Sequence, residues 1–170
     1  MTDADRFEAF VRRYQDMVFA TAVRLLGSRV EAEDIAQTVF LRAFQRFDEI
    51  GASATAAGWL KTVTRNVCLN HLSRFRARWR WVGEEEAAAL VSAADSPALE
   101  LEHADRRERL ARALSQLPDH QRVPLVLFHF ENMSYQDIAV ALGVSVGKVK
   151  TDIHRGRQAL RTQLSDDASR

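Results

Sequence analysis

Arginines and aromatic residues alternate near the middle of the chain, in the stretch SRFRARWRWVG from Ser73 to Gly83. Arginine neutralises phosphate and aromatic rings stack on unpaired bases, so this combination suits a single strand of nucleic acid or a duplex that is being opened. The competing interpretation is the end of an amphipathic helix, where long arginine side chains cover a core that tryptophans close. We favour nucleic acid. The run consists of Arg74, Arg76, Arg78 and Arg80, with Phe75, Trp79 and Trp81 between them.

A second group of hydrogen-bond donors lies near the C-terminus. Ser134 is placed to begin a short helix, Gly143 to form a turn and Ser145 to cap a second helix. This order predicts a helix-turn-helix, whose second helix approaches DNA. A solvated helix face is the alternative, but the preceding helix and turn favour a DNA-reading surface. The outward face and flanks of the second helix carry Gly147, Lys148, Lys150, Thr151, His154, Arg155 and Gln158.

An aspartate, Asp152, interrupts this basic helix. At roughly 100° per residue it lies about 60° from Val149, which belongs to the inward face. Asp152 therefore borders the core side and is not at the centre of the DNA-facing surface. We expect it to position Arg155, three residues later, with Lys148 also within reach.

One pair of residues could suggest nucleophilic catalysis. Cys68 and His71 lie within one turn of a predicted amphipathic helix, without an evident third group or pocket. We expect His71 to be a partly buried histidine with a hydrogen-bond partner, and we expect no enzyme activity. A single cysteine excludes an internal disulfide and is too few for a structural zinc site. No cofactor or metal is expected.

Helical spacing recurs at both ends of the chain, whereas strand signals are absent, which predicts an all-α fold. Gly27 is placed to end a first helix, and Ser28 with Glu31 has the form of a capping box for a second. The apolar stripe of the first helix comprises Phe7, Phe10, Val11, Tyr14, Met17, Val18 and Leu25. That of the second comprises Ile35, Val39, Phe40, Ala43, Phe44 and Phe47, so that Asp34, Gln37 and Leu41 point the other way.

A third helix is predicted from Trp59, after a loop of small residues over 48–58. Its core side comprises Leu60, Val63, Val67 and Phe75, and its outward face comprises Lys61, Thr62, Arg65 and Asn66. Residues 83–105 form an acidic segment without a sustained amphipathic stripe, which indicates a flexible linker. We therefore predict two small helical domains, 1–82 and 106–170, joined by the linker 83–105.

The charge balance and hydropathy place limits on function. The formal net charge is +1, which argues neither for nor against a polyanionic partner. No apolar run approaches the ~20 residues that a membrane span needs, and the first residues do not resemble a signal sequence. We expect a cytoplasmic protein.

Three separated blocks resemble one family, the bacterial extracytoplasmic-function (ECF) sigma factors that contain only sigma regions 2 and 4. AEDIAQTVFLRAF, from Ala32 to Phe44, is similar to the family's Asp-x-x-Gln-Glu-x-Phe motif. GWLKTVTRNVCLNHLSRFRAR, from Gly58 to Arg78, resembles its Trp-Leu…Arg-Asn…Leu segment, and the helix-turn-helix resembles region 4. Their order and separation are those of the family.

The resemblance implies the partners. They are RNA polymerase core, contacted at its β′ coiled-coil and β flap, promoter DNA and an anti-sigma factor, with no small-molecule substrate. Asp34, Gln37 and Leu41 would bind the β′ coiled-coil. The minus-10 element would be bound, and a flipped base held, by the loop 48–57 together with Trp59, Lys61, Arg65, Asn66, Arg74, Arg76 and Arg78. Lys148, Lys150, Thr151, His154 and Arg155 would bind the minus-35 element, and the acidic linker would thread the RNA channel.

The chain departs from the family at three positions. Thr38 stands where the motif has Glu, Asp152 where arginine is common, and Gly156 where alanine is common. Glycine there costs roughly 1 kcal/mol of helix propensity, which predicts a softer reading helix. Two other functions stay open: a sigma mimic that sequesters an anti-sigma factor, and a stand-alone helix-turn-helix regulator.

Overall fold

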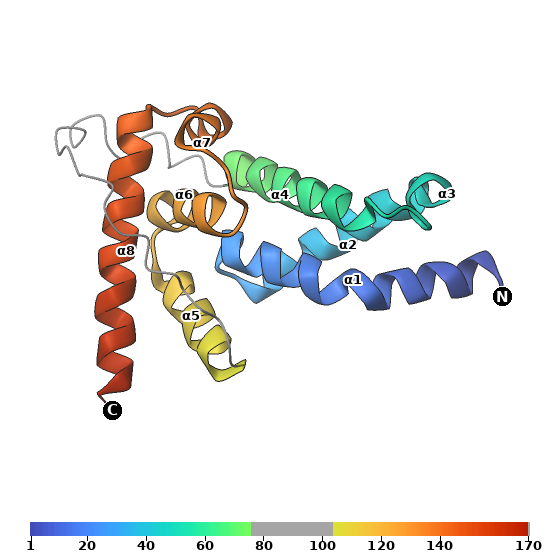
Figure 1. Cartoon of the computed structure of the whole chain (residues 1–170), viewed down its shortest axis with the longest axis horizontal. Coiled ribbons are helices and arrows are strands. Elements are labelled where there is room, and N and C mark those ends of the chain that lie inside the picture. The colour runs from blue at the N-terminus through green and yellow to red at the C-terminus, as the bar shows by residue number, and fades with distance from the viewer. Residues whose placement is uncertain (76–103, 170) are drawn as a thin grey trace. The chain divides into compact units, whose positions relative to one another are not determined.

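The computed structural model describes residues 1–75 and 104–169 of the chain (Figure 1). All regular secondary structure in these ranges is helical, which confirms the prediction of an all-α protein. The chain divides into two compact units, Met1–Phe75 and Arg76–Arg170, which confirms two helical domains. Most of the predicted linker lies outside the described residues, so its bounds and its flexibility stay predictions.

The N-terminal unit consists of three long helices that pack against one another, and of one short helix. The long helices are α1 (Asp3–Leu26), α2 (Arg29–Gln45) and α4 (Ala56–Phe75), and the short α3 (Phe47–Ile50) follows α2 (Figure 1). Apolar side chains from all three long helices meet between them. The largest of these buried side chains are Phe10, Val18, Leu25, Leu26, Ile35, Val39, Leu60 and Leu72.

Two local signals at the first helix junction are confirmed, one of them in part. Gly27 ends α1 in the left-handed conformation, with φ 66°, and donates its N–H to the carbonyl of Val23. The Ser28 hydroxyl caps α2 by accepting the N–H of Glu31 at 3.3 Å. The second half of the predicted capping box is absent, because the Glu31 carboxylate accepts a hydrogen bond from His71 Nε2 at 3.0 Å instead.

The structure corrects three expectations in this unit. Phe44 was predicted in the buried stripe but is 58% exposed. Phe44 lies within α2, about 100° around the helix from the buried Ala43, and its ring is edge-on to that of Phe7, with ring centres 5.0 Å apart. The predicted loop contains α3, and α4 begins at Ala56, three residues before the predicted start.

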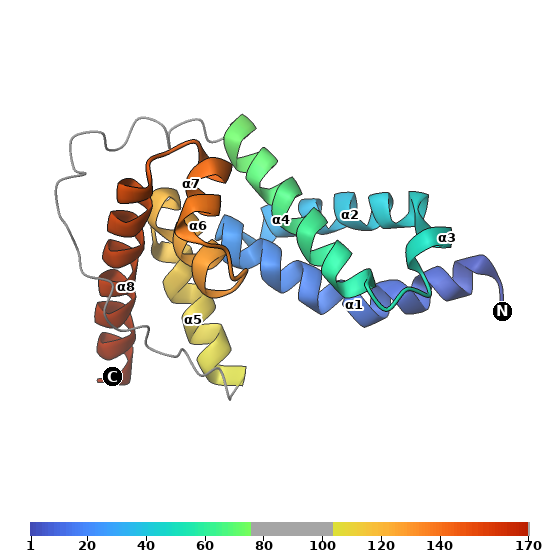
Figure 2. The ribbon, with the colours of Figure 1, turned by 45° about the horizontal axis from the view of Figure 1, so that its top comes forward.

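The C-terminal unit consists of α5 (Ala104–Gln116), α6 (Asp119–His129), α7 (Tyr135–Leu142) and α8 (Val146–Ala168). The long α8 packs against the three others (Figure 2). The helix α5 begins two residues before its predicted start. Fully buried side chains at the centre of this unit are Leu114, Val123, Leu125, Leu127, Ile138 and Ile153.

The helix-turn-helix is formed by α7 and α8 as predicted. Ser134 caps α7 by accepting the N–H of Asp137, and Ser145 caps α8 by accepting the N–H of Lys148, both at 3.1 Å. Gly143 ends α7 with φ 66°, where a side chain would be strained. None of the helices in the described part of the chain is long and apolar enough to cross a membrane.

Candidate functional site

One face of α2 is exposed and partly apolar. Asp34, Gln37 and Leu41 all lie on it, as the sequence predicts, and Leu41 is 61% exposed. Val30, 72% exposed, and Phe44 continue the same face at its two ends. The five side chains follow one another at intervals of four, three, four and three residues, the spacing with which a helix meets another helix in a coiled coil.

We name this surface the α2 stripe; it consists of Val30, Asp34, Gln37, Leu41 and Phe44. Sequence reasoning missed its two ends, Val30 and Phe44. The signal was the heptad spacing itself, which extends from Asp34 and Leu41 in both directions. Thr38, which stands at the family's Glu position, lies beside the stripe. Threonine has no carboxylate to offer a partner, and the Thr38 hydroxyl donates to the carbonyl of Asp34 at 3.1 Å.

The outward side of α4 carries most of the predicted minus-10 residues. Lys61, Asn66 and Arg74 are exposed, and Trp59 and Arg65 are half-buried. Arg76 and Arg78 lie outside the described residues.

An arginine that sequence reasoning missed lies beside Trp59. The Arg46 guanidinium carbon is 5.9 Å from the centre of the indole, and the guanidinium binds the Glu49 carboxylate at 2.5 Å. A cation over the face of tryptophan is attracted by the ring and limits how it can turn. Arg46 therefore helps to place Trp59 at the start of α4.

The segment between α3 and α4 has a defined shape. A side chain at Gly51 would bring a Cβ atom within 2.6 Å of the Phe47 ring, so only glycine lets the backbone pass there. The Ser53 hydroxyl accepts the N–H of Thr55 at 3.2 Å, just before α4 begins. This predicted base-holding loop is thus anchored on an aromatic ring at one end and on a helix at the other.

The outward face of α8 differs from its prediction at two positions. Lys150 is exposed, and His154 and Arg155 are half-buried. The expectation that Thr151 is exposed was wrong: it is 5% exposed, and its hydroxyl donates to the carbonyl of Gly147 at 3.0 Å. This bond to the preceding turn is one that threonine often makes inside helices.

Lys148 is the second position at which the outward face of α8 differs from its prediction. Its ammonium group is bound within the C-terminal unit. Its Nζ lies 2.6 Å from Asp152 Oδ2, and both side chains are largely buried. Asp152 was expected to border the inward face and to position Arg155. It is buried, and its ion pair is with Lys148. Burial raises the pKa of Asp152, opposed by the hydrogen bond and charge of Lys148 and, more weakly, by the charges of His120 and Arg155.

Aromatic and cationic side chains join α6, α7 and α8 of the C-terminal unit. Phe128 of α6 stacks on Tyr135 of α7, with ring centres 4.6 Å apart and an angle of 7° between the planes. Lys150 Nζ lies 5.6 Å from the centre of the Tyr135 ring. Arg157 Nε donates to His129 Nε2 at 3.0 Å. These contacts fix the direction of α8 relative to α6 and α7.

The Cys68 and His71 pair has no catalytic geometry in the described residues. Cys68 is fully buried, and His71 is held by Glu31 from the start of α2. This confirms the expectation that His71 is a partly buried histidine with a hydrogen-bond partner. Within residues 1–75 and 104–169, no group of three histidine, cysteine or acidic side chains is placed to hold a metal ion.

Both units match known protein families. Residues 10–80 match the family described as Sigma-70 region 2, and residues 107–160 match Sigma-70, region 4. The first range contains the α2 stripe and the outward face of α4, and the second contains the helix-turn-helix. The two families thus cover all three surfaces described above.

The chain is also similar to individual proteins. It is 36% identical over 164 residues to ECF RNA polymerase sigma factor SigE of Mycolicibacterium smegmatis, a match that covers 96% of this chain and 63% of that protein. It is 32% identical over 171 residues to ECF RNA polymerase sigma factor SigW of Bacillus subtilis, covering 96% of this chain and 91% of that protein. The chain therefore spans less than two thirds of the first relative and most of the second.

A solved structure is similar to this chain over most of its length. It is the co-crystal structure of the sigma factor RpoE in complex with the anti-sigma factor NepR from Bartonella quintana, 26% identical, with a TM-score of 0.53. The match covers 94% of this chain and 96% of that one. Both family matches and the relatives over nearly the whole chain lead to one conclusion: the chain belongs to the extracytoplasmic-function (ECF) RNA polymerase sigma factors.

Proposed function

We propose that the protein binds RNA polymerase core, directs it to specific promoters and starts transcription there. The observation that carries this proposal is the exposure of Leu41 in the α2 stripe. Exposed apolar side chains in a row mark a surface for a partner. A regulator that acted on duplex DNA alone would have no use for such a surface in a separate unit.

The α2 stripe is the proposed polymerase-binding surface. Asp34, Gln37 and Leu41 would contact the β′ coiled-coil, and Val30 and Phe44 would extend the contact at both ends. The heptad spacing supports a helical partner, because it lets side chains of one helix enter the spaces of another. The C-terminal unit would meet the β flap.

The outward face of α4 and the loop before it are the proposed minus-10 surface. Trp59, Lys61, Arg65, Asn66 and Arg74 belong to it, with Arg76 and Arg78 beyond the described residues. Extruding a base from a duplex costs a few kcal/mol, so a held aromatic ring and nearby donors are needed to offset it. The contact between Arg46 and Trp59 supports this role.

The start of α8 is the proposed minus-35 surface. Lys150, His154 and Arg155 are the accessible donors there, and they would act mostly through phosphates and the shape of the groove. Lys148 and Thr151, both predicted to contact DNA, are bound within the unit, so we assign them the role of fixing the helix. The protein is proposed to be cytoplasmic and not an enzyme, and an anti-sigma factor would mask these surfaces, as NepR binds the Bartonella relative.

The experiment compares Leu41→Asp with Arg42→Gln in the full chain. Arg42 is exposed and lies about 100° around α2 from Leu41. A charge in the middle of an apolar contact should weaken binding to core polymerase about tenfold or more, whereas the Arg42 variant should bind as wild type. Binding is measured by fluorescence anisotropy, and both variants are first shown to melt as wild type does. Equal affinity of the two variants would refute the assignment.

Transcription separates the remaining alternatives. Wild-type protein with core polymerase on fragmented genomic DNA should give transcripts that start at defined sites. Absence of such transcripts, with anti-sigma binding intact, would favour the mimic. Tight binding to duplex DNA without core polymerase, in a gel shift, would favour the stand-alone regulator.

A further inference from the structure

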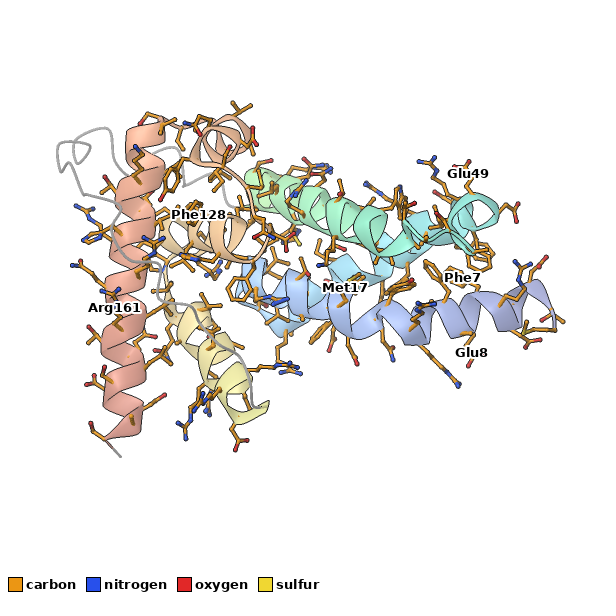
Figure 3. The ribbon with its side chains drawn as sticks, viewed as in Figure 1. Phe7, Glu8, Met17, Glu49, Phe128 and Arg161 are labelled. Atoms are coloured by element: carbon orange, nitrogen blue, oxygen red, sulfur yellow. The ribbon has the colours of Figure 1, made fainter. Side chains whose placement is uncertain are left out.

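Two opposite charges are buried together at the start of α8. Lys148 and Asp152 lie in the first two turns of this helix, whereas Arg161 lies further along it (Figure 3). Lys148 Nζ donates to Asp152 Oδ2 at 2.6 Å, and both side chains are largely buried. The proposed function assigns the start of α8 to the minus-35 element. A lysine of this DNA-binding region is therefore held by a carboxylate of its own helix.

Little water can reach this pair. The cavity beside it measures about 10 Å³, close to the smallest volume that holds one water molecule. Its walls include Pro124 of α6, Leu142 at the end of α7 and Val144 in the turn, together with the pair itself. Buried ion pairs are screened by salt much less than exposed ones. The attraction between the two charges therefore changes little over the salt range of a DNA-binding experiment.

Lys148 is the main counter-ion of Asp152. Burial raises the pKa of Asp152, and the hydrogen bond and charge of Lys148 oppose this rise more than the charges of His120 and Arg155 do. Arg155 follows Lys148 by seven residues, so the two lie about 20° apart around α8 and leave it on the same flank. A Lys148 ammonium without its partner would thus lie beside the duplex backbone that Arg155 is proposed to contact.

The Asp152 carboxylate competes with a DNA phosphate for the same ammonium group. Lysine binds either anion as a point charge that donates hydrogen bonds to oxygen. Moving the ammonium from Asp152 to a phosphate would leave the carboxylate buried without its counter-ion, which is strongly unfavourable. A phosphate contact at an exposed surface is screened by salt and stabilises less. The geometry therefore favours the internal partner.

We propose that Asp152 takes the place of a DNA phosphate for Lys148, so that the start of α8 binds duplex DNA with one phosphate contact fewer. The inference rests on the proposed function, since it requires that the start of α8 meets the minus-35 element. A lysine contact with phosphate strengthens binding to every sequence alike. Asp152 therefore weakens the hold of α8 on duplex DNA without changing which promoter is chosen.

The test compares Asp152→Asn with Asp166→Asn in the full chain with core polymerase. Each change removes one carboxylate from α8, but Asp166 is exposed and lies beyond Arg161. Affinity for a promoter duplex from the transcription experiment is measured in the cold, before the duplex opens, at about 50 to 200 mM salt. Asp152→Asn should make the slope of log affinity against log salt steeper by about 1 and raise affinity about fivefold at physiological salt. Asp166→Asn should change neither, and equal steepening by both variants would overturn the proposal.

Removal of the lysine distinguishes this account from a direct effect of the aspartate on DNA. Lys148→Gln alone should keep the wild-type slope, because this ammonium does not contact DNA. Asp152→Asn combined with Lys148→Gln should keep it too, and this double variant leaves neither charge buried. Circular dichroism at the assay temperature shows which variants are folded, and the double variant decides if Lys148→Gln alone is not. A shallower slope for Lys148→Gln, or a steep slope for the double variant, would contradict the proposal.

Promoter choice provides a second readout. On the same duplex with a scrambled minus-35 element, Asp152→Asn should raise affinity by the same factor as on the promoter. A gain restricted to the promoter would show that Lys148 contacts a base once it is released, and would overturn the phosphate account. Failure of the proposed function is read separately, because the wild-type protein would then give no transcripts with defined start sites.

Discussion

Lys148 and Asp152 form an ion pair inside the C-terminal unit, with Nζ 2.6 Å from Oδ2 and with side chains that are 13% and 8% exposed. They are one turn apart on α8, at its capped end. A pair with so little contact with water is sensitive to the loss of either partner, because the remaining charge is then buried without its hydrogen-bonded counter-ion. Both partners belong to α8, so the pair stabilises the start of that helix from within.

Lys148→Ala should destabilise the C-terminal unit by about 2 kcal/mol, since it leaves the Asp152 carboxyl buried without its partner. Urea unfolding of the full chain at pH 7 measures this. Arg161→Ala, an exposed change further along α8, should stay within about 0.5 kcal/mol of wild type. Asp152→Asn should cost less than Lys148→Ala, because the pKa of Asp152 is raised and the ionised form is the one that burial disfavours. The opposite order of these two variants would contradict this account.

Gly156 and Gly147 should respond differently to alanine. A Cβ atom at Gly156 would lie 3.0 Å from Leu125 Cδ1 and 3.3 Å from the carbonyl of Gln121, at the buried contact of α8 with α6. At Gly147 the nearest atom, the Ser145 hydroxyl oxygen, is 4.0 Å away. Gly147→Ala should therefore gain up to about 1 kcal/mol of helix propensity, whereas at Gly156 crowding should cancel the gain.

Thermal unfolding of the two glycine variants distinguishes a softer helix from a close contact. The sequence-based interpretation of Gly156 was a softer helix, which would predict that Gly156→Ala stabilises as much as Gly147→Ala. Gly156→Leu should destabilise by about 1–3 kcal/mol because the side chain must enter the contact between α6 and α8. A stable Gly156→Leu variant would show that the two helices are not held together at this point.

The stability of the C-terminal unit should fall between about pH 7.5 and pH 5.5, in part because of His129. Burial and the nearby charge of Arg157 lower the pKa of His129. The folded state therefore binds this proton less readily than the unfolded state does. The stabilisation is complete above the unfolded pKa of about 6.5 and is lost as pH falls through that value towards the folded pKa.

His129→Gln provides the control for this pH dependence, since a glutamine oxygen can accept the Arg157 hydrogen bond but does not titrate. The difference in melting temperature between wild type and variant should widen in favour of the variant as pH falls. Parallel curves from pH 7.5 to pH 5.5 would remove His129 from the explanation.

The hydrogen bond between Glu31 and His71 should stabilise the N-terminal unit alone. It joins the start of α2 to α4 across 40 positions of sequence. Glu31→Ala should cost about 1 kcal/mol, the usual worth of such a bond. Glu33→Ala removes an exposed carboxylate two residues away and should have little effect. Proteolysis under native conditions shows which unit opens, and opening of the C-terminal unit by Glu31→Ala would be the contrary result.

The sequence by itself determined the features that depend on a few neighbouring residues. Gly27 and Gly143 end helices because they adopt a positive φ, and Ser28, Ser134 and Ser145 begin them because a hydroxyl can accept a nearby N–H. Apolar spacing predicted the exposed faces of α2 and α4 and much of the buried core of both units, with Phe44 as an exception. These properties follow from local geometry, which is the same in every helix.

Only the tertiary structure decided which partners individual side chains bind and how deeply they are buried. Phe44 is exposed because the buried side of α2 follows Ile35, Val39 and Ala43. Glu31 binds His71, which the fold brings to it from α4. Lys148 and Thr151 lie on a predicted DNA surface but are bound within the unit, and the crowding at Gly156 exists only because α6 crosses α8 there. The contacts of Glu31 and Gly156 depend on neighbours that are distant in sequence. Lys148 and Thr151 bind groups four residues away, a spacing that the sequence shows, but their burial depends on the packing of the whole unit.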